Sequence, residues 1–142
     1  MAIIQYKKYD KLQIAVDCII FGFDGKQLKV LLIKRGFDPE KGKWSLMGGF
    51  TGKHESVDEA AYRVLSQLTG LSSLYMEQLY CFGDVNRDPG GRVVSVAYFA
   101  LIKIDDYDEK LMDEYHAKWF ALNKIPSLIF DHKKMIVYDP QI

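Results

Sequence analysis

Four residues in the middle of the chain have types and spacings that could form a catalytic or binding site: Gly49, Glu55, Arg63 and Gly70. A glutamate carboxylate supplies the hard oxygen that Mg²⁺ prefers as a ligand. The same carboxylate could instead accept hydrogen bonds from nearby backbone or pair with Arg63, and we favour this second role for Glu55. Glu59 is the other candidate metal ligand on this segment.

Basic, glycine and aromatic residues are candidates for contacting a bound molecule. Guanidinium groups match phosphate geometry, glycines let a ligand approach the backbone, and aromatic rings can stack on a base. The arginines could instead be solvated or pair with Asp84 and Asp88, and the aromatic side chains, with those of Trp44 and Phe82, could belong to the core. The predicted ligand-binding residues are Arg35, Gly48, Gly49, Phe50, Arg87 and Arg92.

A helix is indicated directly after the glycine-rich segment. Ser56 followed by Glu59 forms a capping box, in which each side chain accepts a hydrogen bond from the other residue's backbone. Thr69-Gly70 ends the helix, since glycine suits the left-handed conformation there. The apolar residues of the helix fall on one stripe at helical spacing: Val57, Ala60, Ala61, Val64 and Leu68.

Runs of β-branched and aromatic residues, bounded by turn residues, predict strands on both sides of this helix. The acidic stretch 105–115 is expected to be a loop. The element order predicts an α/β (α+β) fold, a mixed β-sheet sandwiched between helices, in a single domain over residues 1–142. The expected strands cover residues 13–23, 28–33, 44–50, 74–82, 93–104 and 116–122, and a second helix covers residues 128–138.

Length and composition exclude several classes of protein. The 142 residues suit one domain, and a formal net charge of zero predicts no broad attraction to nucleic acid or anionic lipid. No apolar run could span a membrane and the N-terminus lacks a secretory signal, so we expect a cytoplasmic protein without membrane contact. Cys18 and Cys81 lie in apolar stretches and are expected to be buried free thiols, without a zinc site.

The spacing of Gly49, Glu55, Arg63 and Gly70 resembles the Nudix box. This resemblance implies the Nudix fold, and it extends over nearly the whole chain. Residues 44–50 resemble the lead-in to the box, residues 87–89 followed by 93–98 the ADP-ribose pyrophosphatase branch, and residues 119–120 and 129–132 the final strand and helix.

The helix departs from the family's pattern at the positions that carry glutamate in active members, where Val64, Gln67 and Leu68 stand instead. Residues three and four apart share one helix face, so glutamates there could converge on a cation. Valine and leucine offer no ligand, and glutamine offers one neutral carbonyl oxygen. The resemblance therefore implies a degenerate box with no catalytic residue and no resident cofactor, with Mg²⁺ required only if hydrolysis persists.

The form of residues 64–70 looks most like Nudix-related transcriptional regulators of bacteria. That resemblance implies a non-catalytic domain, often a homodimer, which senses a small-molecule metabolite, either an ADP-ribose-like nucleotide or a sugar. In that group a winged helix-turn-helix binds DNA, so DNA contact would need a domain absent from this chain. The chain is then expected to be an N-terminal piece of a longer regulator or a free-standing degenerate Nudix protein.

Two other functions remain open at this point. One is a pure dimerisation module, in which the pocket would bind no ligand. His54 and His132 are isolated in the sequence, and neither is predicted to be a catalytic base. A metal-dependent hydrolase of nucleoside diphosphate derivatives such as ADP-ribose would need carboxylates from loops, although these could equally be solvated: Glu77, Asp84, Asp88, Asp105 and Asp106.

Overall fold

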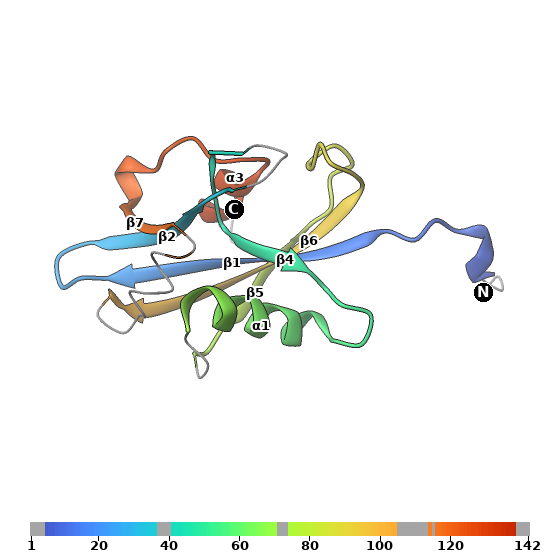
Figure 1. Cartoon of the computed structure of the whole chain (residues 1–142), viewed down its shortest axis with the longest axis horizontal. Coiled ribbons are helices and arrows are strands. Elements are labelled where there is room, and N and C mark those ends of the chain that lie inside the picture. The colour runs from blue at the N-terminus through green and yellow to red at the C-terminus, as the bar shows by residue number, and fades with distance from the viewer. Residues whose placement is uncertain (1–4, 37–40, 71–73, 105–113, 115, 139–142) are drawn as a thin grey trace.

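A seven-stranded mixed sheet forms the centre of the computed structural model, which describes residues 5–36, 41–70, 74–104, 114 and 116–138. Helices α1 (Val57–Thr69) and α3 (His132–Ile136) lie on opposite sides of the sheet in Figure 1. The predicted mixed sheet between helices is therefore confirmed. The strands are β1 (Gln13–Phe23), β2 (Leu28–Lys34), β3 (Trp44–Ser45), β4 (Met47–Phe50), β5 (Glu77–Phe82), β6 (Val93–Lys103) and β7 (Ala117–Ala121), and short 3-10 helices cover Tyr6–Lys8 and Leu122–Lys124.

Strand β1 is the central strand. It pairs in parallel with β6 along its whole length, in the sheet order β3-β2-β1-β6-β5, and β7 pairs with β2. The other edge of β1 is divided: β2 pairs with its last residues up to Phe21↔Val30, and β4 pairs with its first half, from Ala15↔Phe50 to Cys18↔Met47. The end of β2 and strand β4 therefore meet beside the first half of β1.

The side chains of β1 enter two apolar cores, because successive residues of a strand point to opposite faces. Cys18 and Ile20 belong to the core that α1 covers, whereas Ile19 belongs to the core that contains Met135 of α3. Burial on both faces explains why the strand is apolar almost without alternation. Asp17 shares the parity of Ile19, so this carboxylate points to the side of α3, where it is only 6% exposed.

Helix α1 begins and ends at the residues that the sequence predicted. The Ser56 side chain accepts the Glu59 backbone N–H at 3.0 Å, and the Glu59 carboxylate accepts the Ser56 N–H at 3.2 Å. Gly70 ends the helix with φ +75° and donates to the Ser66 carbonyl. The buried face contains Ala60, Ala61 and Val64 as predicted, together with Leu65, while the side chain of Leu68 lies outside the described part.

The predicted helix over residues 128–138 is too long, since α3 covers only His132–Ile136. Leu128 forms a bridge with Trp44, and the Ile129 N–H donates to the Trp44 carbonyl at 3.1 Å. Phe130 then takes a left-handed conformation with φ +50°, which is incompatible with a continuing helix. These pairings with a distant strand override the local helical pattern.

Strand β5 corrects two expectations. It begins at Glu77 rather than at residue 74. Cys81, expected to be buried like Cys18, is exposed, although Phe82, the next residue of the same edge strand, is buried. Of the acidic stretch 105–115 only Glu114 lies inside the described part, so the loop expected there stays a prediction.

Within the described residues, no helix has the length and apolar character needed to cross a membrane.

Candidate functional site

A cavity of about 610 Å³ opens where β1, the end of β2 and β4 meet. Among the described residues that line it, none belongs to α1. Its inner wall is buried and includes Asp17, Ser45, Leu46, Arg87 and His132. Its outer wall is more exposed and includes Lys34, Arg35, Phe50, His116 and Phe130.

Cations and aromatic rings give the outer wall its character. Lys34 is the last residue of β2, and Arg35 comes directly after it. The guanidinium carbon of Arg35 lies 5.5 Å from the ring centre of Phe130, within the range of a cation–π contact. Phe50, at the end of β4, is 53% exposed, so its ring is available to a ligand. This wall therefore suits an anionic group beside a flat ring.

Two glycines of β4 stand where a side chain would have little room. Gly48 pairs with Asp17, and a Cβ at Gly48 would collide with the Asp17 carboxylate and come within 3.0 Å of the Val16 carbonyl oxygen. A Cβ at Gly49 would lie 3.0 Å from a methyl group of Val64 on α1. Glycine at position 48 is therefore what allows the Asp17 side chain to occupy the inner wall.

Five residues interact in what we call the buried polar cluster: Asp17, Arg87, Ser95, Asp131 and His132. Of these, Asp17, Arg87 and His132 line the inner wall, Ser95 is buried outside the lining, and Asp131 is partly buried. Arg87 donates to both carboxylate oxygens of Asp131 at 2.9 and 2.7 Å. Ser95 Oγ donates to Asp17 Oδ2 at 2.5 Å, while Arg87 Nη2 lies 4.0 Å from the same oxygen. His132 Nε2 lies 3.4 Å from Asp17 Oδ1. Arg87 is thus committed mainly to Asp131, and Asp17 has one close side-chain donor within the part of the chain that the structure describes.

The hydrogen bonds around His132 define its protonation. The Leu46 backbone N–H donates to Nδ1 at 3.0 Å, so the neutral ring has its proton on Nε2, on the side of Asp17. Burial lowers the pKa of His132, and its carboxylate neighbours Asp17 and Asp131 only partly oppose this effect. Burial also raises the pKa of Asp17, against the opposing effects of His132, Ser95 and Arg87. Burial favours the neutral form of each group, whereas the Ser95 hydroxyl that donates to Asp17 and the nearby Arg87 favour its ionised carboxylate.

Glu55 pairs with Arg63, as we favoured. Glu55 Oε1 accepts from Arg63 Nη2 at 2.6 Å and from the Gly52 N–H at 2.7 Å, and Oε2 accepts from Arg63 Nε at 3.0 Å. Arg63 also donates to the Phe50 carbonyl at 2.8 Å. These hydrogen bonds, chiefly the one from Arg63, lower the pKa of Glu55 to about 2. The pair fastens the loop after β4 to α1.

The residues of the degenerate box, with Glu55 before α1 and Glu59 and Val64 within it, do not fit a divalent cation. Both oxygens of Glu55 are engaged by Arg63, and a carboxylate oxygen of Glu59 accepts the Ser56 N–H in the capping box. Val64 is 3% exposed within the core and has no ligand atom. No group of three or more acidic, histidine or cysteine side chains in the described residues is placed to hold a metal.

Five of the six predicted ligand-binding residues line the cavity: Arg35, Gly48, Gly49, Phe50 and Arg87. Arg92 is not among the lining residues, and Arg87 pairs with Asp131 rather than with Asp84 or Asp88. Ligand contact at each of the six stays a prediction. Asp84 lies near Lys134 at 3.5 Å, outside the cavity lining.

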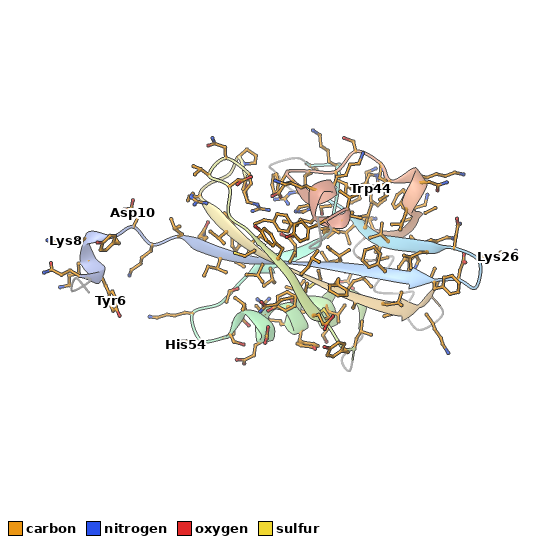
Figure 2. The ribbon with its side chains drawn as sticks, turned by 180° about the vertical axis from the view of Figure 1, so that it is seen from behind. Tyr6, Lys8, Asp10, Lys26, Trp44 and His54 are labelled. Atoms are coloured by element: carbon orange, nitrogen blue, oxygen red, sulfur yellow. The ribbon has the colours of Figure 1, made fainter. Side chains whose placement is uncertain are left out.

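Other residues singled out by the sequence lie apart from the cavity. Phe82 is buried, and the Trp44 ring packs edge-on against Phe120 at 4.8 Å. Figure 2 shows His54 on the side of the sheet away from Trp44, and the N-terminal segment with Tyr6 projecting from the body. Glu77 accepts a hydrogen bond from Tyr75 at the exposed start of β5, while Asp105 and Asp106 lie outside the described residues.

Sequence reasoning missed Asp17 and misjudged His132, which is a member of the buried polar cluster rather than isolated. A signal for Asp17 existed, because it is the one charged residue between Gln13 and Phe23. A charge inside a strand that is buried on both faces needs a specific partner. No comparable local signal marked His132, whose partners come from distant strands.

Comparisons with known proteins bear on the whole chain. A family model described as the NUDIX domain matches residues 11–138. The chain is 37% identical over 138 residues to the ADPR responsive transcriptional repressor NtrR of Acinetobacter baylyi, covering 93% of the chain and 55% of that protein. It is 39% identical over 132 residues to an ADP-ribose pyrophosphatase of Methanocaldococcus jannaschii, covering 93% of the chain and 75% of the relative.

A solved structure adds a likeness in three dimensions. The NUDIX domain of Shewanella oneidensis NrtR, crystallised with ADP ribose, superposes with a TM-score of 0.72 and 32% identity, over 94% of this chain and 89% of that one. The chain spans only about half the length of the repressor from A. baylyi.

Proposed function

Since the chain belongs to the Nudix family, we propose that it is a ligand-sensing Nudix domain that binds ADP-ribose or a related nucleotide without ordinary Nudix hydrolysis. The observation that supports this most directly is the separation of two surfaces. The cavity with Arg35 and Phe50 is available to a ligand, whereas Val64 of the degenerate box is packed into the core. Binding and metal chemistry, which the family joins in one site, are thus uncoupled.

The outer wall supports a ligand that combines phosphate with a flat ring. A guanidinium donates to phosphate in a planar fork, and Arg35 presents one at the mouth of the cavity. The exposed ring of Phe50 is suited to stacking on a base. The names of the repressor and of the NrtR domain connect similar chains with ADP-ribose, which favours that compound over a simple sugar.

Metal-dependent hydrolysis of ADP-ribose is the second candidate. The observation that favours it is the 39% identity to an ADP-ribose pyrophosphatase. It would require carboxylates other than Glu55 and Glu59, because both are engaged in hydrogen bonds, and Val64 is buried. Asp88 and Glu114 line the cavity and are the carboxylates nearest to that requirement outside the buried polar cluster.

Partners and location are part of the same proposal. We propose a cytoplasmic protein that forms a homodimer. The likeness to a transcriptional repressor supports contact with DNA, through a domain not present among these 142 residues. A small metabolite would then be the signal and DNA release or capture the response. The 55% share of the repressor that the chain covers leaves room in that relative for such a domain.

Isothermal titration with ADP-ribose, with and without Mg²⁺, tests the proposal, and chromatography of the mixture detects any AMP or ribose 5-phosphate. We expect binding that does not require Mg²⁺ and no product. Arg35→Ala should weaken binding about 10- to 100-fold, the range for one hydrogen bond to a charged group. Lys53→Ala, at an exposed loop residue, is the matched charge-loss control and should bind normally. Mg²⁺-dependent cleavage would establish the second candidate.

A further inference from the structure

The two walls of the cavity differ in charge, and this difference favours one orientation of a bound ligand. Lys34 and Arg35 lie on the exposed outer wall, whereas the inner wall contains the carboxylate of Asp17. Arg87, the cation of the inner wall, is occupied by the two oxygens of Asp131. A phosphate entering the cavity would be attracted at the mouth and would meet an acidic group at the inner end.

Asp17 has room for further hydrogen bonds. A carboxylate offers about four lone-pair sites. Among the described residues, Ser95 Oγ is the one donor at close hydrogen-bond distance, at 2.5 Å. His132 Nε2 at 3.4 Å and Arg87 Nη2 at 4.0 Å are more distant. A buried carboxylate with open lone pairs at a cavity wall gains from a donor that arrives with the ligand.

His132 supplies the complementary half of the site. Because Nδ1 accepts from Leu46, the Nε2 atom bears the hydrogen and is a donor at the same wall. An acceptor and a donor 3.4 Å apart match a hydroxyl group, which donates with its hydrogen and accepts with its oxygen. A phosphate oxygen can only accept and would face the Asp17 carboxylate, so it fits this wall poorly.

We infer that Asp17 and His132 form a hydroxyl-reading subsite, which takes the sugar end of the ligand while its diphosphate lies against Lys34 and Arg35. This inference rests on the proposed function, since it assigns an orientation to an ADP-ribose-like ligand. Asp17 is the specificity-determining residue of the pair. Gly48 is the neighbour that makes room for it, because any Cβ there collides with its carboxylate.

The test compares ligands that differ in the terminal sugar. ADP-ribose, ADP and ribose 5-phosphate are titrated into the wild-type protein and into Asp17→Asn, with Asp84→Asn as a control at an exposed aspartate outside the cavity lining. Wild type should bind ADP-ribose about 10- to 100-fold more tightly than ADP, as expected for a hydrogen bond to a charged group. Asp17→Asn should lose that preference and keep its affinity for ADP, whereas Asp84→Asn should retain it.

The alternative results are distinguishable. Equal weakening of ADP and ADP-ribose in Asp17→Asn, or an unchanged preference, overturns the subsite while leaving the proposed function intact. Wild-type protein that binds none of these compounds overturns both. If Asp17→Asn does not fold, the wild-type preference for ADP-ribose over ADP and a crystal structure of the complex decide the matter: a sugar hydroxyl at Asp17 supports the subsite, and a phosphate or base there refutes it.

Discussion

Returning a glutamate to the helix by Val64→Glu should destabilise the fold rather than restore hydrolysis. Val64 is 3% exposed in the core between α1 and the sheet, and one of its methyl groups lies 3.0 Å from where a Gly49 Cβ would be. There is little space for a longer side chain, and the residues of the core cluster that contains Val64 are apolar. A carboxylate placed there would be buried without a partner.

The magnitude follows from two contributions. Loss of the buried valine side chain removes at least about 1.5 kcal/mol of apolar burial. The new carboxyl avoids burial of its charge by taking up a proton, which costs about 1.4 kcal/mol per pH unit above its ordinary pKa of about 4.3, or roughly 3.7 kcal/mol at pH 7. The expected destabilisation at pH 7 is therefore roughly 5 kcal/mol. At pH 5 the destabilisation is smaller than at pH 7 by roughly 2.7 kcal/mol.

Urea unfolding of wild type, Val64→Glu and Val64→Ala at both pH values measures this effect. The difference between the two variants isolates the carboxyl group. Its folded pKa is raised, so the stability of Val64→Glu relative to Val64→Ala must be greater at low pH and decline as pH rises. Gln67→Glu restores a family glutamate at an exposed position and should change stability by less than about 0.5 kcal/mol.

Two results would refute this reasoning. One is a Val64→Glu protein as stable at pH 7 as Val64→Ala. The other is stabilisation of Val64→Glu by Mg²⁺ accompanied by cleavage of ADP-ribose, which would mean that the helix face can still open to a metal and substrate. Either result would place position 64 at an accessible site instead of inside the core.

Further expectations concern the inner wall of the cavity. Gly48→Ala should destabilise the protein by about 1–3 kcal/mol through overpacking against Asp17, and should weaken ADP-ribose binding; thermal melts and titration check both, and an unaltered protein would contradict the close approach. Asp131→Asn leaves the Arg87 guanidinium without its charged partner, for an expected loss of about 3–5 kcal/mol in urea unfolding. His132 has a lowered pKa, so its contribution is present above the ordinary value of 6.5 and is lost as pH falls below it. His132→Gln should therefore flatten the decline in stability between pH 7 and pH 5, and an unchanged slope would assign that decline to other groups.

Local interactions explain which parts of the fold were predictable. The ends of α1 depend on Ser56, Glu59 and Gly70, which act within a few residues of one another, and all were predicted correctly. The range of β1 was also predicted exactly as it is found, because a long apolar run between turn residues has few alternatives. Gly48 and Gly49 of β4 were predicted from their residue type alone, because a residue without a Cβ lets other groups approach the backbone.

Long-range contacts explain the failures. Residues 128–131 have a helical pattern, but Leu128 and Ile129 pair with Trp44, far away in the sequence, and the helix starts only at His132. Cys81 is exposed while its neighbour Phe82 is buried, because the coverage of each side chain of β5 depends on what packs on that face of the sheet, which the local sequence does not encode. In both cases tertiary pairing decided between conformations that are locally similar in energy.

The amino-acid sequence by itself determined that α1 has no row of carboxylates at positions 64, 67 and 68, since ligand atoms are a property of residue type. It also determined the capping box, the glycines of β4 and the range of β1. Only the tertiary structure decided that Asp17 and His132 face each other across one cavity wall. They are 115 residues apart by their numbers, and a buried acid and imidazole meet only when the sheet and α3 pack together.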